Sequence, residues 1–366
     1  MNAERLQRLM TVTRQHGLAG LALVPGHSMD YVSEIHSHTS ERPIVLFLPV
    51  DGEPAIIIPA LEAMKASADG IPPERIFAYT DEEWYPAAFA RAARALNLNA
   101  QWGVEALQMR VVELDMLTEM APGFRSVHAE EIIIAVRGVK DEAEIAKMQV
   151  AVDIAEKGIE MLLPTIKIGE TEKEIANRLR GILLDLGGDG MAFGPIVSAG
   201  PNSASPHAVP TDRPLAAGDL LIIDWGVTKD GYVSDITRTY AVGEISDTAR
   251  TIYELVKGSN AAGRRASQPG ASGQDVDRAS RAVIVNGGYG DYFIHRTGHG
   301  LGKEAHEPPS IVEGNTTPMV PGNVFTVEPG IYVPELGGVR IEDDVVITKD
   351  GHISLTSLSR ELIQVG

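Results

Sequence analysis

The residues with the clearest chemical potential are carboxylates that end two similar apolar segments. The segment Pro214–Gly226 carries Asp224 after its apolar run, and the segment Pro318–Gly330 carries Glu328 at the matching place. Short apolar runs bounded by glycine predict buried strands rather than helices. A carboxylate at the end of a buried strand needs a compensating charge. The repeat therefore predicts an internally duplicated fold whose halves meet at a charged centre.

A predicted hairpin places a second acid beside Asp224. Asp230-Gly231 lies between alternating segments and predicts a two-residue turn. Counting back from this turn places Thr237 opposite Asp224, so that Asp235 lies diagonal to Asp224 on the same face. Thr237 is then a candidate to hydrogen-bond a ligand carboxylate.

The second segment predicts a matching pair of acids. A turn from Pro334 to Gly338 pairs Val333 with Val339 and makes Glu342 the diagonal neighbour of Glu328. Like charges crowded across a strand pair repel one another. Four such acids therefore require cations.

A histidine adds a fifth candidate ligand. His299 lies between glycines in Gly298-His-Gly-Leu-Gly, and a neutral imidazole is a common metal ligand. One histidine with four carboxylates suits manganese best, with cobalt or zinc as alternatives. Because four carboxylates balance two divalent ions, the charge count favours two metal ions.

These motifs resemble the pita-bread metallopeptidases of the creatinase, aminopeptidase P and prolidase type, a family that also includes methionine aminopeptidases. The resemblance covers nearly the whole chain. It rests on five candidate ligands in their local contexts and on further phrases in the family's style. These phrases are Pro210-Thr-Asp-Arg-Pro, Gly218-Asp-Leu, Asp235-Ile-Thr-Arg-Thr, Gly298-His-Gly-Leu-Gly, His306-Glu-Pro-Pro and Glu328-Pro-Gly-Ile-Tyr.

The resemblance implies a role for each candidate ligand. Asp224 holds one metal, His299 and Glu328 hold the other, and Asp235 and Glu342 bridge the pair. A metal-bridged water or hydroxide is the implied nucleophile, so that no serine or cysteine nucleophile is needed. Glu328 is the implied proton shuttle.

A second group of residues is expected around the metals. By resemblance, His207 and His306 orient the substrate and stabilise the tetrahedral intermediate as hydrogen-bond donors. His295 is a candidate supporting residue. Arg340 shares its strand parity with Glu342, so we expect it to point into the same cavity and pair with a ligand carboxylate. Tyr332 is a weaker candidate.

Length and local signals predict two domains of the α/β class. A chain of 366 residues exceeds the usual size of a single domain. Gly138 ends an apolar run, and Asp141 with Glu144 gives a helix-start signature. We expect a smaller creatinase-like α/β domain over residues 1–137, followed by a pita-bread catalytic domain with pseudo-two-fold duplication over residues 138–366.

Composition excludes several classes of partner. The net charge of −18 gives no electrostatic footprint for nucleic acid or an anionic membrane. The N-terminus lacks the apolar core of a signal peptide, and no apolar run is long enough to span a membrane, so a cytoplasmic protein is expected. The resemblance further implies a small peptide substrate and a homodimer.

The sequence thus favours a di-metal exopeptidase that cleaves Xaa-Pro bonds near a free N-terminus. The N-terminal domain argues against a methionine aminopeptidase, which consists of little more than the catalytic half. Xaa-Pro dipeptidase and Xaa-Pro aminopeptidase both stay open, because Ser310 stands where some prolidases carry an arginine that binds the dipeptide carboxylate. The alternatives are a metal-free peptide-binding protein and a creatinase-like hydrolase that needs no metal.

Overall fold

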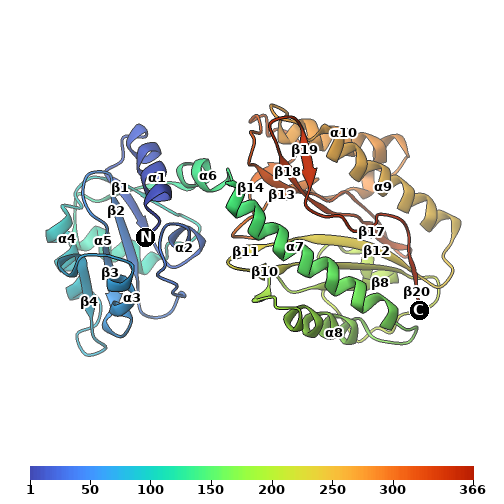
Figure 1. Cartoon of the computed structure of the whole chain (residues 1–366), viewed down its shortest axis with the longest axis horizontal. Coiled ribbons are helices and arrows are strands. Elements are labelled where there is room, and N and C mark those ends of the chain that lie inside the picture. The colour runs from blue at the N-terminus through green and yellow to red at the C-terminus, as the bar shows by residue number, and fades with distance from the viewer. The chain divides into compact units, whose positions relative to one another are not determined.

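A computed structural model describes all 366 residues and divides them into two compact units (Figure 1). The first unit is Met1–Arg137 and the second is Gly138–Gly366. None of the helices combines the length and the apolar character that crossing a membrane requires.

The first unit is a mixed six-stranded sheet between two layers of helices, with the strand order β4-β3-β2-β1-β5-β6. Its strands are β1 (Gly20–Leu23), β2 (Val45–Pro49), β3 (Ala55–Pro59), β4 (Ile76–Tyr79), β5 (Gln101–Val104) and β6 (Arg125–His128). Its helices are α1 (Ala3–Gln15), α2 (His27–Val32), α3 (Ala63–Ala68), α4 (Pro86–Leu96), α5 (Val111–Met120) and α6 (Glu130–Arg137), with the 3-10 turns η1 (Ala60–Glu62) and η2 (Pro73–Arg75).

Alternation along the buried strand β1 produces the two layers of this unit. Leu21 and Leu23 pack with residues of α1 and α6, whereas Ala22 packs with residues of α4 and α5. Successive side chains of a strand point to opposite faces, so a strand that is apolar at every position requires a helical layer on each side.

The second unit is built around two sheets that are antiparallel except where β20 pairs with β12 in parallel. The first sheet has the order β20-β12-β9-β8 and the second has the order β14-β13-β15-β18-β19. The strands of the first are β8 (Ile196–Ala199), β9 (Leu220–Trp225), β12 (Ile236–Val242) and β20 (Gln364–Val365). Those of the second are β13 (Gly298–Gly300), β14 (Glu307–Ile311), β15 (Val324–Val327), β18 (Asp343–Ile347) and β19 (His352–Ser354).

Smaller elements complete the second unit. A three-stranded sheet contains β7 (Gly190–Met191), β10 (Val227–Lys229) and β11 (Tyr232–Val233), and a hairpin joins β16 (Gly330–Val333) to β17 (Gly337–Arg340). The helices are α7 (Glu142–Leu162), α8 (Glu172–Asp185), α9 (Asp247–Ala266) and α10 (Gly273–Asn286), with η3 (Leu163–Thr165), η4 (Gly200–Ala204) and η5 (Gly290–Tyr292).

The predicted duplication of the catalytic half is present. In each half a helix pair precedes the central strand that leads to an acid: α7 and α8 come before β9, and α9 and α10 come before β15. Thr171 and Ser272 cap α8 and α10, and each forms a bridge to the proline that opens its repeat, Pro214 or Pro318. Each such cap stabilises its helix by about 1 kcal/mol. The same local chemistry therefore ties each helix to its strand.

The turn before each acid-bearing strand is also repeated. The side chain of Asp219 accepts a hydrogen bond from the backbone N–H of Ala216, and the side chain of Asn323 accepts one from Val320. Gly218 and Gly322 both have positive φ, at 96° and 95°, a conformation that favours glycine. The two halves thus enter their central strands through the same turn.

The predicted pairing of the first hairpin is confirmed. Lys229 lies opposite Tyr232 and Asp224 opposite Thr237.

The predicted pairing of the second hairpin is wrong. Val333 lies opposite Gly337 rather than Val339, and Gly330 lies opposite Arg340. Because Val327 pairs with Asp343 in the same register, Glu328 and Glu342 are directly opposite rather than diagonal.

The reason for this difference lies outside the hairpin. A Cβ on Gly338 would lie 2.1 Å from the carbonyl oxygen of Ser203, and one on Gly337 would lie 2.7 Å from that of Gly200. The two adjacent glycines therefore allow η4 to pack closely against β17. They do not mark the centre of a longer turn.

Candidate metal centre

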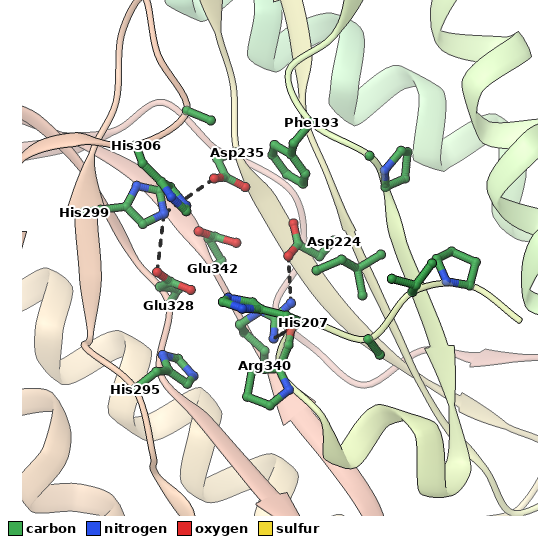
Figure 2. Close-up of a pocket in the computed structure, with 18 of the residues that line it drawn as sticks. Phe193, His207, Asp224, Asp235, His295, His299, His306, Glu328, Arg340 and Glu342 are labelled. Carbon is green, nitrogen blue, oxygen red and sulfur yellow. Dashed lines mark hydrogen bonds and ion pairs between the residues drawn. The ribbon is translucent and has the colours of Figure 1, made fainter. Parts of the chain in front are cut away.

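The candidate site is a pocket of about 800 Å³ in the second unit (Figure 2). All residues expected to bind metal or substrate line it: His207, Asp224, Asp235, His295, His299, His306, Glu328, Arg340 and Glu342. The five candidate metal ligands point toward one shared space.

The first half of the duplicated unit contributes two of the acids. Asp224 lies near the end of β9, and Asp235 immediately precedes the paired strand β12. Both residues are buried, with 8% and 4% of their surface exposed. The hairpin register thus brings two carboxylates to the same end of one sheet.

The second half contributes the histidine and the other acids. His299 is the central residue of β13, Glu328 follows β15, and Glu342 lies between β17 and β18. His299 and Glu342 are buried, whereas Glu328 keeps 14% of its side chain exposed toward the pocket.

The side-chain atoms that could bind cations form overlapping groups. Asp224, Asp235 and Glu342 place ligand atoms within 4.8 Å of one another, and so do His299, Glu328 and Glu342. Glu342 belongs to both groups. A third group joins Asp235 and His299 to His306. The ring centroids of His299 and His306 are 4.0 Å apart.

Burial and mutual repulsion dominate the electrostatics of the four acids. Burial raises the pKa of Asp235 well above its usual range, and the negative charges of Glu342 and Asp224 raise this pKa further. Burial together with the charge of Glu328 likewise raises the pKa of Glu342. Burial raises the pKa of Glu328 to about 7, although the positive charge of Arg340 opposes the shift. The protein alone therefore compensates these carboxylates poorly.

Two observations fit this site to divalent cations. Oδ1 of Asp224 is buried without a hydrogen-bond partner, which is costly unless a cation compensates it. Burial also lowers the pKa of His299, so its imidazole is neutral. Nε2 of His299 lies 3.4 Å from Oε1 of Glu328 and 3.6 Å from Oδ2 of Asp235. A neutral imidazole close to carboxylate oxygens is the donor set expected around a first-row metal ion.

Arg340 is the cation that contacts this cluster. Its Nη2 donates to Oδ2 of Asp224 at 2.7 Å, as expected from its strand parity. Its Nε donates to Oγ1 of Thr237 at 3.2 Å, and this hydroxyl donates to Oε2 of Glu342 at 2.6 Å. The side chain of Arg340 is only 3% exposed. It holds Asp224 directly and Glu342 through Thr237.

Tyr332 connects Arg340 to His295. Nη1 of Arg340 donates to the Tyr332 hydroxyl at 2.7 Å, and this hydroxyl lies 2.9 Å from Nε2 of His295. Nδ1 of His295 lies 2.7 Å from the backbone carbonyl of Arg296. Because burial lowers the pKa of His295 to about 4, the ring is neutral: Nδ1 donates and Nε2 accepts. Both ring nitrogens are engaged within the protein, so His295 supports the site through its neighbours.

His207 and His306 lie on the exposed wall of the pocket. His207 follows η4, which the close approach of Gly337 and Gly338 holds against the β16–β17 hairpin. His306 directly precedes β14, and Glu307 beside it forms a buried ion pair with Lys140. Each histidine is thus carried by an anchored segment but presents its own ring to the pocket.

Sequence reasoning missed residues that support the site from behind. Asp343 is fully buried and accepts hydrogen bonds from Asn260, Arg238 and Arg360 at 2.8–2.9 Å. The hydroxyl of Thr297 donates to Asp277 at 2.6 Å, while the carbonyl of Thr297 accepts from the N–H of Glu328. The acidic pair Asp343-Asp344 directly after Glu342 is the sequence feature that could have pointed to these supporting residues. The hydrogen-bond partners Asn260 and Arg238 lie far from Asp343 in the sequence.

Comparison with known proteins identifies the family. The metallopeptidase family M24 matches residues 146–349, and the creatinase/prolidase N-terminal domain matches residues 5–139. The chain belongs to metallopeptidase family M24. The resemblance inferred from the motifs is therefore confirmed, as is an α/β fold with a creatinase-type N-terminal domain and a pita-bread catalytic domain.

Relatives of the M24 chain match it over nearly its full length. A protein named Xaa-Pro dipeptidase from Lactobacillus delbrueckii subsp. lactis is 34% identical over 368 residues, or 99% of this chain and 98% of the relative. The crystal structure of a prolidase from Thermococcus sibiricus has a TM-score of 0.94 at 33% identity and covers 100% of both chains. That of a dipeptidase from Pyrococcus horikoshii OT3 has a TM-score of 0.93 at 35% identity, covering 99% of this chain and 100% of that one. Membership in M24 makes the chain a metallopeptidase of a family that uses divalent metals.

Proposed function

We propose that this chain is a di-metal exopeptidase that hydrolyses the peptide bond before proline near a free N-terminus. The observation that carries the proposal is the pair of overlapping ligand groups that share Glu342 on the floor of the pocket. The names of the relatives, Xaa-Pro dipeptidase and prolidase, support the preference for proline.

The residues present define which side chains would hold the ions. Asp224 would hold one ion, His299 and Glu328 the other, and Asp235 and Glu342 would serve both. The oxygen-rich set suits manganese best, with cobalt or zinc as alternatives. When bound, two divalent ions supply Lewis-acid stabilisation of developing charge and an activated water at neutral pH.

The remaining steps fall to side chains of the chain itself. Glu328 is the carboxylate with its side chain most open to the pocket, which suits it to take a proton from the attacking water and return it to the leaving amine. His207 and His306 present exposed imidazoles that can donate hydrogen bonds to the reacting carbonyl oxygen. Arg340 fixes Asp224 and therefore acts as a positioning residue.

A chelation and reconstitution experiment tests this function. The chelated protein is assayed on a Xaa-Pro dipeptide, a Xaa-Pro tripeptide and matched Xaa-Ala peptides, before and after manganese is restored. We expect cleavage of the Xaa-Pro peptides only after metal is restored. A protein that binds no manganese, cobalt or zinc and cleaves no peptide would instead be a binding protein. Activity that persists in chelator would indicate a creatinase-like hydrolase without metal.

A further inference from the structure

The segment 199–211 forms part of the pocket wall and carries His207. Residues 206–210 line the cavity, and His207 points into it (Figure 2). One side chain from outside the segment bonds this stretch: Nη1 of Arg340 donates to the carbonyl of Pro206 at 3.2 Å. The position of His207 therefore depends on how the two ends of the segment are held.

Glu172 holds both ends. It is the first residue of α8 and is 0% exposed. Its Oε1 accepts a hydrogen bond from the N–H of Ala199 at 2.8 Å, and its Oε2 accepts from the N–H and the hydroxyl of Thr211 at 2.9 and 2.7 Å. Nδ2 of Asn202 donates to both oxygens, at 3.2 and 3.1 Å. Each carboxylate oxygen thus fixes one end of the segment.

The surroundings of Glu172 suit a buried anion without an ion pair. Its donors are neutral N–H and O–H groups, and hydrogen bonds to an ionised acceptor are about twice as strong as those between neutral groups. The N-terminus of a helix also favours negative charge. Because Ala199 is fully buried, its N–H would be left without an acceptor if the carboxylate moved away. These bonds therefore resist any movement of the segment.

The scaffold common to both halves of the unit does not depend on this carboxylate. In the first half the N–H of Lys173 donates to the carbonyl of Thr211 at 3.2 Å. In the second half the N–H of Gln274 donates to the carbonyl of Asn315 at 2.9 Å. These equivalent backbone bonds join each helix to the chain that leads to its central strand.

The residue that matches Glu172 in the second half is Gly273, since each directly follows the residue that caps its helix. A Cβ on Gly273 would lie 2.4 Å from the carbonyl oxygen of Ser310, so the second half leaves no room for a side chain at this place. The carboxylate thus belongs only to the half whose junction carries His207.

We infer that Glu172 is a positioning residue that directs His207 toward the reacting carbonyl oxygen. The inference rests on the proposed function, in which His207 donates a hydrogen bond to that oxygen. Because Glu172 holds one end of the segment with each oxygen, it fixes the path of the chain between them and the direction of the imidazole. Misplacing a group by about 1 Å can lower a rate by about 100-fold.

A matched pair of substitutions tests this role. Glu172→Gln keeps the shape of the side chain but leaves one acceptor oxygen, so one end of the segment is released whichever way the amide turns. Glu174→Gln makes the same change on the same helix, where the N–H and the hydroxyl of Thr171 both donate to the single oxygen Oε2. On a Xaa-Pro dipeptide, manganese-loaded Glu172→Gln should lower kcat by about 10- to 100-fold and change KM by less than about 3-fold. Glu174→Gln should match wild type.

A double variant shows whether Glu172 acts through His207. Removing one hydrogen-bond donor to a developing oxyanion lowers kcat by about 100- to 1000-fold, which is the loss expected for His207→Ala. In that background Glu172→Gln should lower kcat by less than about 2-fold more, because the group that it positions is absent. Bound manganese should stay at the wild-type level throughout. Losses that multiply in the double variant would overturn the inference, and so would an equal loss in Glu174→Gln.

A milder pair of variants keeps the inference testable if Glu172→Gln folds poorly. Thr211→Val removes the hydroxyl that donates to Oε2 but keeps the N–H, and it should lower kcat by about 3- to 10-fold. Thr211→Ser keeps the hydroxyl and should recover most of this loss. A wild-type kcat in Thr211→Val would count against the inference.

Hydrogen exchange followed by mass spectrometry tests the same role without turnover. The segment 199–211 should exchange at least about 10-fold faster in Glu172→Gln than in wild type or Glu174→Gln. Unchanged exchange would overturn the inference. Failure of wild type to cleave any peptide would count against the proposed function, and the exchange rates would still decide whether Glu172 holds the segment.

Discussion

Replacing Arg340 with methionine removes the only cation that hydrogen-bonds a carboxylate of the candidate metal centre. The guanidinium donates to Asp224 and Tyr332 at 2.7 Å each, and to the carbonyl of Pro206 at 3.2 Å. Methionine keeps much of the apolar stem and therefore much of its packing. The substitution thus isolates the charge and its hydrogen bonds.

The expected cost depends on whether metal is present. In the metal-free protein Asp224 becomes a buried, unpaired carboxylate, and breaking a buried pair in this way costs about 3–5 kcal/mol. In the manganese-loaded protein a cation compensates Asp224, so the cost should fall toward that of ordinary hydrogen bonds, about 0.5–1.5 kcal/mol each. The control Arg278→Met disrupts an exposed ion pair and should cost about 0–1 kcal/mol in both states.

Urea unfolding followed by tryptophan fluorescence measures this cost in the catalytic unit. Trp225 is buried next to Asp224 and is the only tryptophan of Gly138–Gly366, so replacing Trp84 and Trp102 with phenylalanine isolates its signal. If Arg340→Met costs no more than Arg278→Met in the metal-free protein, Asp224 does not depend on Arg340. The double variant Asp224→Asn/Arg340→Met should be less destabilised than the sum of the single variants, because the unpaired charge is gone.

Two further predictions concern the metal ions themselves. Manganese at 100 times its dissociation constant should raise the free energy of unfolding by about 2.7 kcal/mol for each bound ion. This gain is measured as an increase in Tm that a chelator reverses. An unchanged Tm would show that the protein does not bind manganese at the candidate site. His299→Ala should lose both bound manganese and turnover, while its circular dichroism spectrum shows that the fold is retained. His306→Ala should keep a nearly normal metal content, measured by mass spectrometry, and should turn over more slowly. Equal metal loss in both variants would show that His306 is itself a ligand, as its proximity to Asp235 and His299 allows.

Local sequence signals predicted the parts of the site that local chemistry determines. Asp230-Gly231 defines a tight turn, and counting from it gives the observed pairing of Asp224 with Thr237. Strand parity likewise placed Arg340 on the same side as Glu342, where it contacts Asp224. In these cases the deciding geometry is contained within a short stretch of chain.

The sequence was a poor guide where distant segments meet. Pro334–Gly338 offers two adjacent glycines, and the turn could close at either. The contact with η4 decides the register, because both glycines face its backbone.

The duplicated fold explains why four acids converge, but not why the two sides of the site differ. Each half supplies two carboxylates from a central strand pair, whereas His299 and Arg340 both come from the second half. Arg340 hydrogen-bonds Asp224 directly, whereas it acts on Glu328 only through its charge, and His299 beside Glu328 is neutral. The two candidate ion positions therefore differ in the side chains that contact their acids, even though their strands are related by the repeat. Duplication supplies the scaffold, and these two residues, which both come from the second half, make its centre asymmetric.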